Sequence, residues 1–363
     1  MKVLISGGGT GGHIFPALAI ANALRRRDPG TEILFVGAEN RMEMERVPAA
    51  GYEIVGLPVA GFDRKRLWRN FGVLLKLWRS MRIARRVLRE FNPDIAVGVG
   101  GYASGPMLKE AQKNGVPTVI QEQNSYPGVT NKLLAKGARA ICVAYDGTER
   151  FFPADRIVKT GNPVRANILN TGISQTEAKR RLGFDAEKPL VVVVGGSLGA
   201  RTVNNAMKQA LRPIVESGAS VLWQTGKLYA EECIASAEGV ADAKVTSFVS
   251  EMDLAYRAAD LMVSRAGAST ISEIQLVGVP AILVPSPNVA EDHQCKNAMA
   301  LVERDAAVMV SDADCCEKLA GEVIELLSDE AHRQLLGANV KKMALTGSDE
   351  KIVDIIYQVL SDK

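Results

Sequence analysis

Two glycine-rich runs combine residue types that suit chemistry on a phosphorylated ligand. The run Gly7–His13 contains Thr10 and ends in a histidine, and the run Gly195–Ala200 contains Ser197; each follows a short apolar segment. Glycine lets the backbone approach a ligand closely, and a helix that starts there offers unpaired N–H groups and a positive dipole. The sequence therefore predicts an anion site in each half of the chain, with a phosphorylated substrate bound in a cleft between two domains.

The same runs also match motifs of other enzyme classes. The first fits the G-x-G-x-x-G dinucleotide fingerprint, although Glu39 stands too late for the acid expected after the next strand. The second fits the G-x-S-x-G nucleophile elbow of hydrolases, for which Asp260 with His293 or His332 would supply acid and base. Both alternatives stay open, but one anion role explains both runs, because a hydroxyl residue occupies the same place in each.

Further polar clusters follow other apolar segments, at the strand ends where open α/β sheets bind ligands. They are Gly98–Pro106, Gln121–Asn124, Ser264–Glu273 and Glu291–Gln294. In the third cluster, small residues open a helix that suits a diphosphate, and Glu273 lies early in that helix. Its carboxylate suits the vicinal hydroxyls of a ribose. The alternative is an acid that only complements the helix dipole.

The elements that must position these clusters alternate between Val/Ile/Leu-rich strands and helices. We expect helices at 16–27 and 74–91 and an amphipathic helix at 350–360. We expect strands at 3–6, 33–36, 95–99, 118–121, 141–143, 190–194, 221–224, 245–248, 261–264, 281–284 and 307–310. Continuous apolar strands between helices indicate parallel sheets covered on both faces. The sequence thus predicts an α/β fold of two doubly wound domains, with Pro163 at the hinge.

A basic, partly aromatic stretch lies in the first half. Residues 64–90 hold ten basic residues and one acid, and Leu74, Trp78 and Met81 share a helical face. Such a segment suits an anionic membrane surface, and the excess of basic residues over acidic ones in residues 1–163 agrees with this. The alternative is a core-packed helix with a solvated basic face. We expect no nucleic-acid binding, because no nucleic-acid motif accompanies the stretch.

Composition bounds the class of protein. The 363 residues, 47% hydrophobic and 23% charged, suit two globular domains. We expect neither a signal peptide nor a membrane-spanning helix, since no apolar segment is long enough. The five cysteines include no C-x-x-C pair, which is typical of reduced thiols. We expect no metal ion and no cofactor, since we identify no Asp-x-Asp segment at a strand end.

Seven motifs in order resemble the MurG family of bacterial cell-wall glycosyltransferases over nearly the whole chain. They are Gly8–His13, Gly100–Pro106, Glu122–Asn124, Gly161–Arg165, Gly195–Ala200, Ala268–Glu273 and His293–Gln294. The resemblance implies a GT-B fold, with two Rossmann-like domains and a cleft between them. It implies an acceptor-binding, membrane-associating domain at 1–163, to which a C-terminal helix at 348–363 returns. A domain that binds UDP-N-acetylglucosamine (UDP-GlcNAc) is expected at 164–347.

The resemblance also implies roles for individual residues. The donor UDP-GlcNAc is expected to contact Thr10, Gly11, Gly12, Asn124, Arg165, Ser197, Val249, Ala268, Ser269, Thr270, Ile271, Ser272, Glu273 and Gln294. The diphosphate of the acceptor is expected at Gly9, Gly101, Tyr102 and Ser104. The membrane patch is expected at Leu67, Trp68, Phe71, Leu74 and Trp78.

The implied reaction is an inverting transfer of N-acetylglucosamine in peptidoglycan biosynthesis. The acceptor is the C4 hydroxyl of N-acetylmuramic acid in undecaprenyl-pyrophosphoryl-MurNAc-pentapeptide, at the cytoplasmic face of the plasma membrane. His13 is our candidate base, because imidazole accepts a proton near neutral pH; Glu122 is the alternative. Ser197, Arg165 and helix N-termini are expected to stabilise the leaving diphosphate. Cell-wall synthesis proteins are possible partners. A 2-epimerase-like enzyme or a non-catalytic nucleotide-sugar-binding protein are the alternatives.

Overall fold

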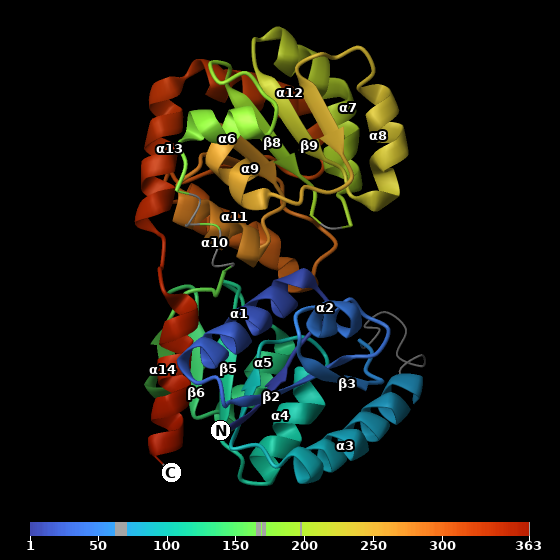
Figure 1. Ribbon diagram of the computed structural model, residues 1–363, viewed down its shortest axis with the longest axis vertical. Coiled ribbons are helices and arrows are strands. Elements are labelled where there is room, and N and C mark those ends of the chain that lie inside the picture. The colour runs from blue at the N-terminus through green and yellow to red at the C-terminus, as the bar shows by residue number, and fades with distance from the viewer. Residues whose placement is uncertain (62–70, 165–167, 169–171, 197, 363) are drawn as a thin grey trace. The chain divides into compact units, whose positions relative to one another are not determined.

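The computed structural model describes residues 1–61, 71–164, 168, 172–196 and 198–362. The chain divides into two compact units (Figure 1). Unit 1 comprises Met1–Arg165 with Thr346–Lys363, and unit 2 comprises Ala166–Leu345. Leu67, Trp68, Arg165 and Ser197, all predicted site residues, lie outside the described residues.

Unit 1 is built on a seven-stranded sheet in which every neighbouring pair is parallel. The strands are β1 (Lys2–Ser6), β2 (Glu32–Ala38), β3 (Glu53–Leu57), β4 (Ile95–Gly98), β5 (Thr118–Glu122), β6 (Ala140–Val143) and β7 (Ile157–Lys159). Their order is β3-β2-β1-β4-β5-β6-β7. Strands β3 and β7 were not predicted, because their residues are mostly half-buried and lack a continuous apolar run.

Helices cover both faces of this sheet, which explains why its central strands are apolar throughout. They are α1 (Gly11–Arg27), α2 (Glu43–Ala49), α3 (Phe71–Phe91), α4 (Ser104–Lys113), α5 (Val129–Leu134) and α14 (Ser348–Ser361), with short 3₁₀ turns at Ala135–Gly137 and Ala154–Arg156. The last helix packs beside α1 in unit 1 (Figure 1), and its residues Ile352, Val353 and Ile356 are fully buried there.

Charged residues add to this packing of α14 on α1. Arg26 contacts Asp349 at 2.6 Å and Glu350 at 2.7 Å, and Arg27 pairs with Asp354. These charges lie at the surface, so the buried apolar face of α14 carries most of the stabilisation.

Unit 2 repeats the plan with a six-stranded parallel sheet of order β10-β9-β8-β11-β12-β13. Its strands are β8 (Leu190–Val194), β9 (Ser220–Gln224), β10 (Ala243–Thr246), β11 (Leu261–Ser264), β12 (Ala281–Leu283) and β13 (Val308–Met309). Its helices are α6 (Gln175–Arg181), α7 (Arg201–Glu216), α8 (Ala230–Ser236), α9 (Met252–Ala258), α10 (Ala268–Val277), α11 (His293–Val302), α12 (Cys315–Ser328) and α13 (Glu330–Lys342), with 3₁₀ turns at Lys227–Tyr229 and Ala290–Asp292. The predicted pair of doubly wound parallel domains is confirmed.

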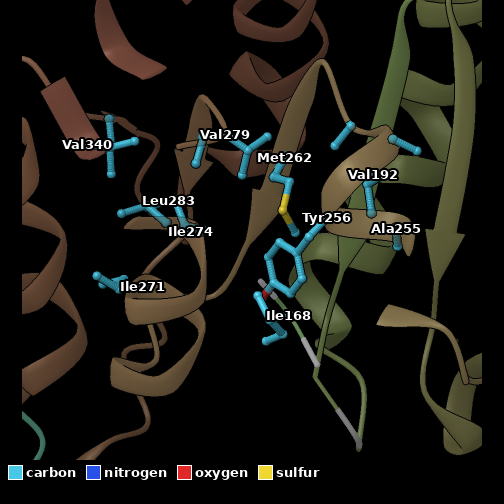
Figure 2. Packing of buried hydrophobic residues seen from close by; sticks show 14 of the residues in the cluster. Ile168, Val192, Ala255, Tyr256, Met262, Ile271, Ile274, Val279, Leu283 and Val340 are labelled. Carbon is cyan, nitrogen blue, oxygen red and sulfur yellow. The ribbon is translucent and has the colours of Figure 1, made fainter. Parts of the chain in front are cut away.

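Two apolar clusters fill the two faces of the second sheet. Figure 2 shows part of one of them, in which the side chain of Met262 extends toward the ring of Tyr256. In both units the strand order changes direction beside the first strand, at β1/β4 and at β8/β11. Open α/β sheets bind ligands at the carboxyl ends of the strands at such a switch point. Both glycine-rich runs follow a first strand and therefore lie there.

Candidate functional site

In unit 1 the loops after β1 and β4 meet with almost no space between their backbones. An added Cβ on Gly7 would lie 3.1 Å from the carbonyl oxygen of Gly100, and an added Cβ on Gly101 would collide with the carbonyl oxygen of Gly8. Gly101 also has φ +85°, a conformation that side chains rarely adopt. The glycines thus permit the contact of the two loops, and the N–H groups of Gly11 and Gly12 head α1 beside it.

His13 lies at this junction, on the first turn of α1. Its Nδ1 is 3.1 Å from Gly8 O and 3.2 Å from Thr10 Oγ1, and an added Cβ on Gly100 would lie 2.9 Å from Nε2. A carbonyl oxygen only accepts, so Nδ1 carries the proton of the neutral ring. The lone pair then resides on Nε2, which is the nitrogen that a general base uses.

The side chain of Ser104 lies inside the same junction. Its hydroxyl is fully buried and lies 2.7 Å from Ser6 O and 2.9 Å from Gly100 O. The side chain therefore ties the end of β1 to the loop after β4. Only the backbone of Ser104, at the start of α4, remains suited to an acceptor diphosphate, whereas the Tyr102 side chain nearby is exposed.

Glu43, which is not among the predicted site residues, supports the first glycine-rich run. Its side chain is 1% exposed, and its Oε1 accepts Gly9 N–H at 2.9 Å and Ala38 N–H at 3.0 Å. An added Cβ on Gly8 would collide with this oxygen, so the glycine makes room for the carboxylate. The N–H of Gly9, predicted to bind the acceptor diphosphate, is therefore already engaged.

The carboxylate of Glu122 is surrounded by hydrogen-bond donors. Its Oε1 accepts the backbone N–H and the side-chain amide of Asn124 at 3.0 and 3.1 Å. Its Oε2 accepts Gly128 N–H at 3.1 Å and the side-chain amide of Asn131 at 2.9 Å. The side chain is 1% exposed. Four donors already occupy its two oxygens, so the geometry favours Glu122 as the residue that orients Asn124 over a role as proton acceptor.

In unit 2 one glutamine connects two loops of the predicted donor site. Gln224, at the end of β9, donates to Gly196 O at 3.0 Å in the second glycine-rich run and to Ser247 O at 3.1 Å. Ser247 precedes Val249, whose side chain is buried in the core, so that only its backbone suits contact with a base. Gly199, with φ +80°, packs its backbone against Thr225 O.

The start of α10 supplies the other part of that site. Ala268, Ile271, Ser272 and Glu273 are all buried, and Ile271 belongs to the apolar core, so its contribution is limited to the backbone. The buried hydroxyl of Ser269 has no hydrogen-bond partner among the described residues, which leaves it suited to an anion. Thr270, the next residue of the helix, is half-buried.

Two further residues that are predicted to bind UDP-GlcNAc have hydrogen-bond partners in the structure. Glu273 Oε2 accepts the hydroxyl of Tyr256 at 2.7 Å. Gln294, near the start of α11, accepts Ser286 N–H at 2.9 Å through its Oε1, which orients its amide group.

The hydrolase alternative fails on geometry. Asp260 accepts Leu190 N–H at 2.7 Å and pairs with Lys179 at 2.7 Å. It precedes β11, at the amino end of the strands, whereas the second glycine-rich run follows the carboxyl end of β8. Because β8 and β11 are parallel, the sheet separates Asp260 from the motif of Ser197.

The expectation about Asp-x-Asp segments was wrong, because Asp312-Ala313-Asp314 follows β13. Asp312 pairs with Arg265 at 2.5 Å, and Asp314 pairs with Lys318 at 3.2 Å. Both carboxylates thus form ion pairs with basic side chains. Across the described ranges, no group of three or more His, Cys, Asp or Glu side chains is arranged to hold a metal ion.

The start of α3 exposes apolar side chains. Leu74, Leu75 and Trp78 are each more than half exposed, and the Arg82 guanidinium lies 4.8 Å from the Trp78 ring centroid. Ala84 and Leu88, later in the helix, are buried. The core-packed alternative therefore describes only the second half of α3. Of the helices in the described part of the chain, none is long and apolar enough to cross a membrane.

Comparisons with known proteins agree with this architecture. Residues 3–143 match the glycosyltransferase family 28 N-terminal domain, and residues 190–353 match the corresponding C-terminal domain. The chain is 56% identical to the UDP-N-acetylglucosamine--N-acetylmuramyl-(pentapeptide) pyrophosphoryl-undecaprenol N-acetylglucosamine transferase of Phocaeicola vulgatus, covering 100% of this chain and 97% of that protein. It is 53% identical to the protein of the same name from Porphyromonas gingivalis, over 99% of this chain and 96% of that one.

Solved structures show the same fold. The crystal structure of MurG from Acinetobacter baumannii matches with a TM-score of 0.78 and 27% identity, over 98% of this chain and 99% of that one. A UDP-GlcNAc 2-epimerase from Neisseria meningitidis matches at 0.69 with 11% identity, which shows a shared fold only. With both family 28 domains in order and full-length identity above one half, the chain belongs to the MurG family of glycosyltransferases.

Proposed function

We propose that this protein transfers N-acetylglucosamine from UDP-GlcNAc to the C4 hydroxyl of MurNAc in undecaprenyl-pyrophosphoryl-MurNAc-pentapeptide, the step from lipid I to lipid II of peptidoglycan synthesis. The observation that carries the proposal is the full-length identity of 56% to a transferase named for this reaction. The positions of the two glycine-rich runs, each at a switch point of its own sheet, support it.

Residues 164–347 are proposed to bind the donor. The N-terminus of α10 and the hydroxyl of Ser269 would hold the diphosphate, with Ser197 and Arg165 assigned to the same group from the family resemblance. Glu273 would accept the ribose hydroxyls, the backbone of Val249 would contact uracil, and Gln294 would recognise the sugar. These N–H and O–H groups, positioned before the reaction begins, would stabilise the negative charge that develops on the leaving UDP.

Residues 1–163, with the helix 348–363, are proposed to bind the acceptor. The backbone of the loops after β1 and β4 would bind its diphosphate through N–H groups that head α1 and α4. His13 Nε2 would accept the proton of the C4 hydroxyl as that oxygen attacks C1 of the donor sugar and the bond from C1 to UDP breaks. A single displacement of this kind inverts the anomeric centre.

The exposed apolar start of α3, with basic residues around it, is proposed to dock on anionic lipid at the cytoplasmic face of the plasma membrane. Replacing Leu74 and Trp78 by serine tests this, because neither side chain is needed for the core. Binding to anionic vesicles should fall while the unfolding transition stays unchanged. Unaltered vesicle binding would exclude this docking surface.

The transfer itself is tested with radiolabelled UDP-GlcNAc and a lipid-linked muramoyl acceptor, with and without a chelator. Label should move to the lipid in both conditions, and Glu273→Gln should reduce the transfer. Free N-acetylmannosamine as the labelled product would instead indicate an epimerase. Donor binding without any product would indicate a non-catalytic nucleotide-sugar-binding protein.

A further inference from the structure

Tyr256 lies directly behind the carboxylate proposed to bind the ribose. Its hydroxyl donates to Glu273 Oε2 at 2.7 Å, and the two residues are 2% and 6% exposed. A hydrogen bond to a carboxylate is among the strong kinds in proteins, and its strength increases away from water. The carboxylate of Glu273 is therefore held from α9, a different helix from the one that carries it.

The same helix is continuous with the turn proposed to contact uracil. Val249 precedes α9 by three residues, and its buried side chain belongs to the same apolar cluster as Tyr256 and Ile271 of α10. Figure 2 shows Tyr256, Ile271 and Ile274 within that cluster. One packed unit therefore supports both the base-contacting turn and the ribose carboxylate.

The terminal torsion of a glutamate is broad, so burial alone does not fix the plane of its carboxylate. A tyrosine ring packed in the core has little such freedom, and its hydroxyl presents a proton at one defined point. We infer that Tyr256 is a positioning residue for the donor nucleotide, which orients the carboxylate of Glu273 toward the ribose hydroxyls. The inference rests on the proposed function and adds a source of selectivity for ribose over deoxyribose.

The chain supplies a matched control. Tyr52 in unit 1 is 4% exposed, and its hydroxyl donates to Asn22 Oδ1 at 2.7 Å. Tyr52→Phe thus removes a buried tyrosine hydrogen bond of the same length whose partner, Asn22, has no proposed contact with the nucleotide. Each variant removes one buried hydroxyl and leaves the aromatic ring in place. The two differ in whether the lost hydrogen bond orients Glu273.

The experiment measures binding of UDP, and of UDP lacking the ribose 2′-hydroxyl, by calorimetry. In Tyr256→Phe the affinity for UDP should fall about tenfold, because the carboxylate of Glu273 loses the hydrogen bond that orients it toward the ribose. Its preference for UDP over the deoxy form should shrink as well. The KM for UDP-GlcNAc should rise by a similar factor with kcat unchanged, and Tyr52→Phe should change neither quantity.

Wild-type affinity and wild-type selectivity in a folded Tyr256→Phe variant would overturn the inference. Failure of the unaltered protein to bind UDP would overturn the proposed function instead. Should the variant not fold, the hydroxyl proton of Tyr256 in the unaltered protein gives a second measurement by NMR. Its resonance should shift when UDP is added but not when the form lacking both ribose hydroxyls is added. Equal responses to both nucleotides would contradict the inference.

Discussion

The carboxylate of Glu43 accepts the backbone N–H of Gly9 at 2.9 Å and so connects α2 to the first glycine-rich run. The same oxygen accepts Ala38 N–H at 3.0 Å. Glu43→Ala removes the acceptor of two N–H groups and should lower the free energy of unfolding by about 2–4 kcal/mol. Glu43→Gln keeps an oxygen for both and should cost less.

Urea unfolding measures this difference, with the exposed neighbour Glu45→Gln as the control. Because the loop belongs to unit 1, the KM for the lipid acceptor should rise in Glu43→Ala while calorimetric UDP affinity stays unchanged. A variant with normal stability and a normal acceptor KM would show that Glu43 does not support the loop.

His13→Ala should reduce transfer by about 10²–10⁴-fold, the usual contribution of a general base. Binding of UDP should remain as in the unaltered protein, since the residue acts on the acceptor. His332→Ala, an exposed histidine on α13, is the matched control and should retain full activity. Near-normal turnover of His13→Ala would assign the proton to another group.

Glu122→Gln separates an orienting role from a catalytic one. In the wild type, the donors Gly128 N–H and the Asn131 amide face a carboxylate oxygen of Glu122. In the variant, one carboxylate oxygen is replaced by an NH₂ group, which cannot accept these hydrogen bonds, so the protein should lose stability. The pH dependence of kcat/KM should keep its shape, because the residue is not the proton acceptor. Disappearance of the acidic limb of that profile, where activity falls as the base becomes protonated, in Glu122→Gln but not in His13→Ala would make Glu122 the base.

Much of this fold could be predicted from the sequence because it depends on local patterns. The strands β1, β4 and β8 are continuous apolar runs, and the glycines after them mark where a backbone approaches another group. The pairs Glu43–Gly9 and Tyr256–Glu273 could not be predicted, since each joins residues from different elements. In the sequence, Glu43 is one acid in a charged segment and resembles a solvated residue.

The strand β3 was missed for a related reason. Its residues Glu53–Leu57 include a glutamate and a glycine, and most are half-buried, so it lacks an apolar signature. The pairing with β2 supplies its stability. Likewise, Asp312 belongs to an Asp-x-Asp segment of the kind that can bind a metal ion. Only the structure shows that its carboxylate forms an ion pair with Arg265.

Ile352→Ala should destabilise unit 1 by about 2–5 kcal/mol, because it leaves a cavity beneath a fully buried position. Asp354→Asn, which removes one of the surface partners of Arg27, should have a small effect that vanishes in high salt. Urea unfolding of both variants at low and high salt distinguishes the contributions. A larger loss from the charge variant would mean that ion pairs, not burial, hold α14.

Burial raises the pKa of the Cys142 thiol to about 12 and that of Cys315 to about 12. Both should therefore resist a thiol reagent near pH 8 in the folded protein, because the thiolate is the reactive form, whereas exposed Cys316 should react. Cys316→Ser serves as the control. Rapid modification of Cys142 in folded protein would contradict its burial.

The same two thiols give stability a pH dependence. Unfolded, each thiol ionises near its ordinary pKa; folded, it stays protonated, so the unfolded state loses protons first as the pH rises. The stability from burying neutral thiols is complete below about pH 8.5 and declines as the pH rises toward the raised pKa values. Unfolding measured across this window in Cys142→Ala should show a weaker decline than in the unaltered protein.

The return of α14 to unit 1 has a consequence for synthesis on the ribosome. Unit 1 takes Thr346–Lys363 from the far end of the chain, so all of unit 2 is translated before unit 1 receives its last helix. Until then, the surface that Ile352, Val353 and Ile356 cover stays open to water. Unit 2 can complete its core earlier, while the nascent first unit keeps this apolar surface exposed until Thr346–Lys363 has been translated.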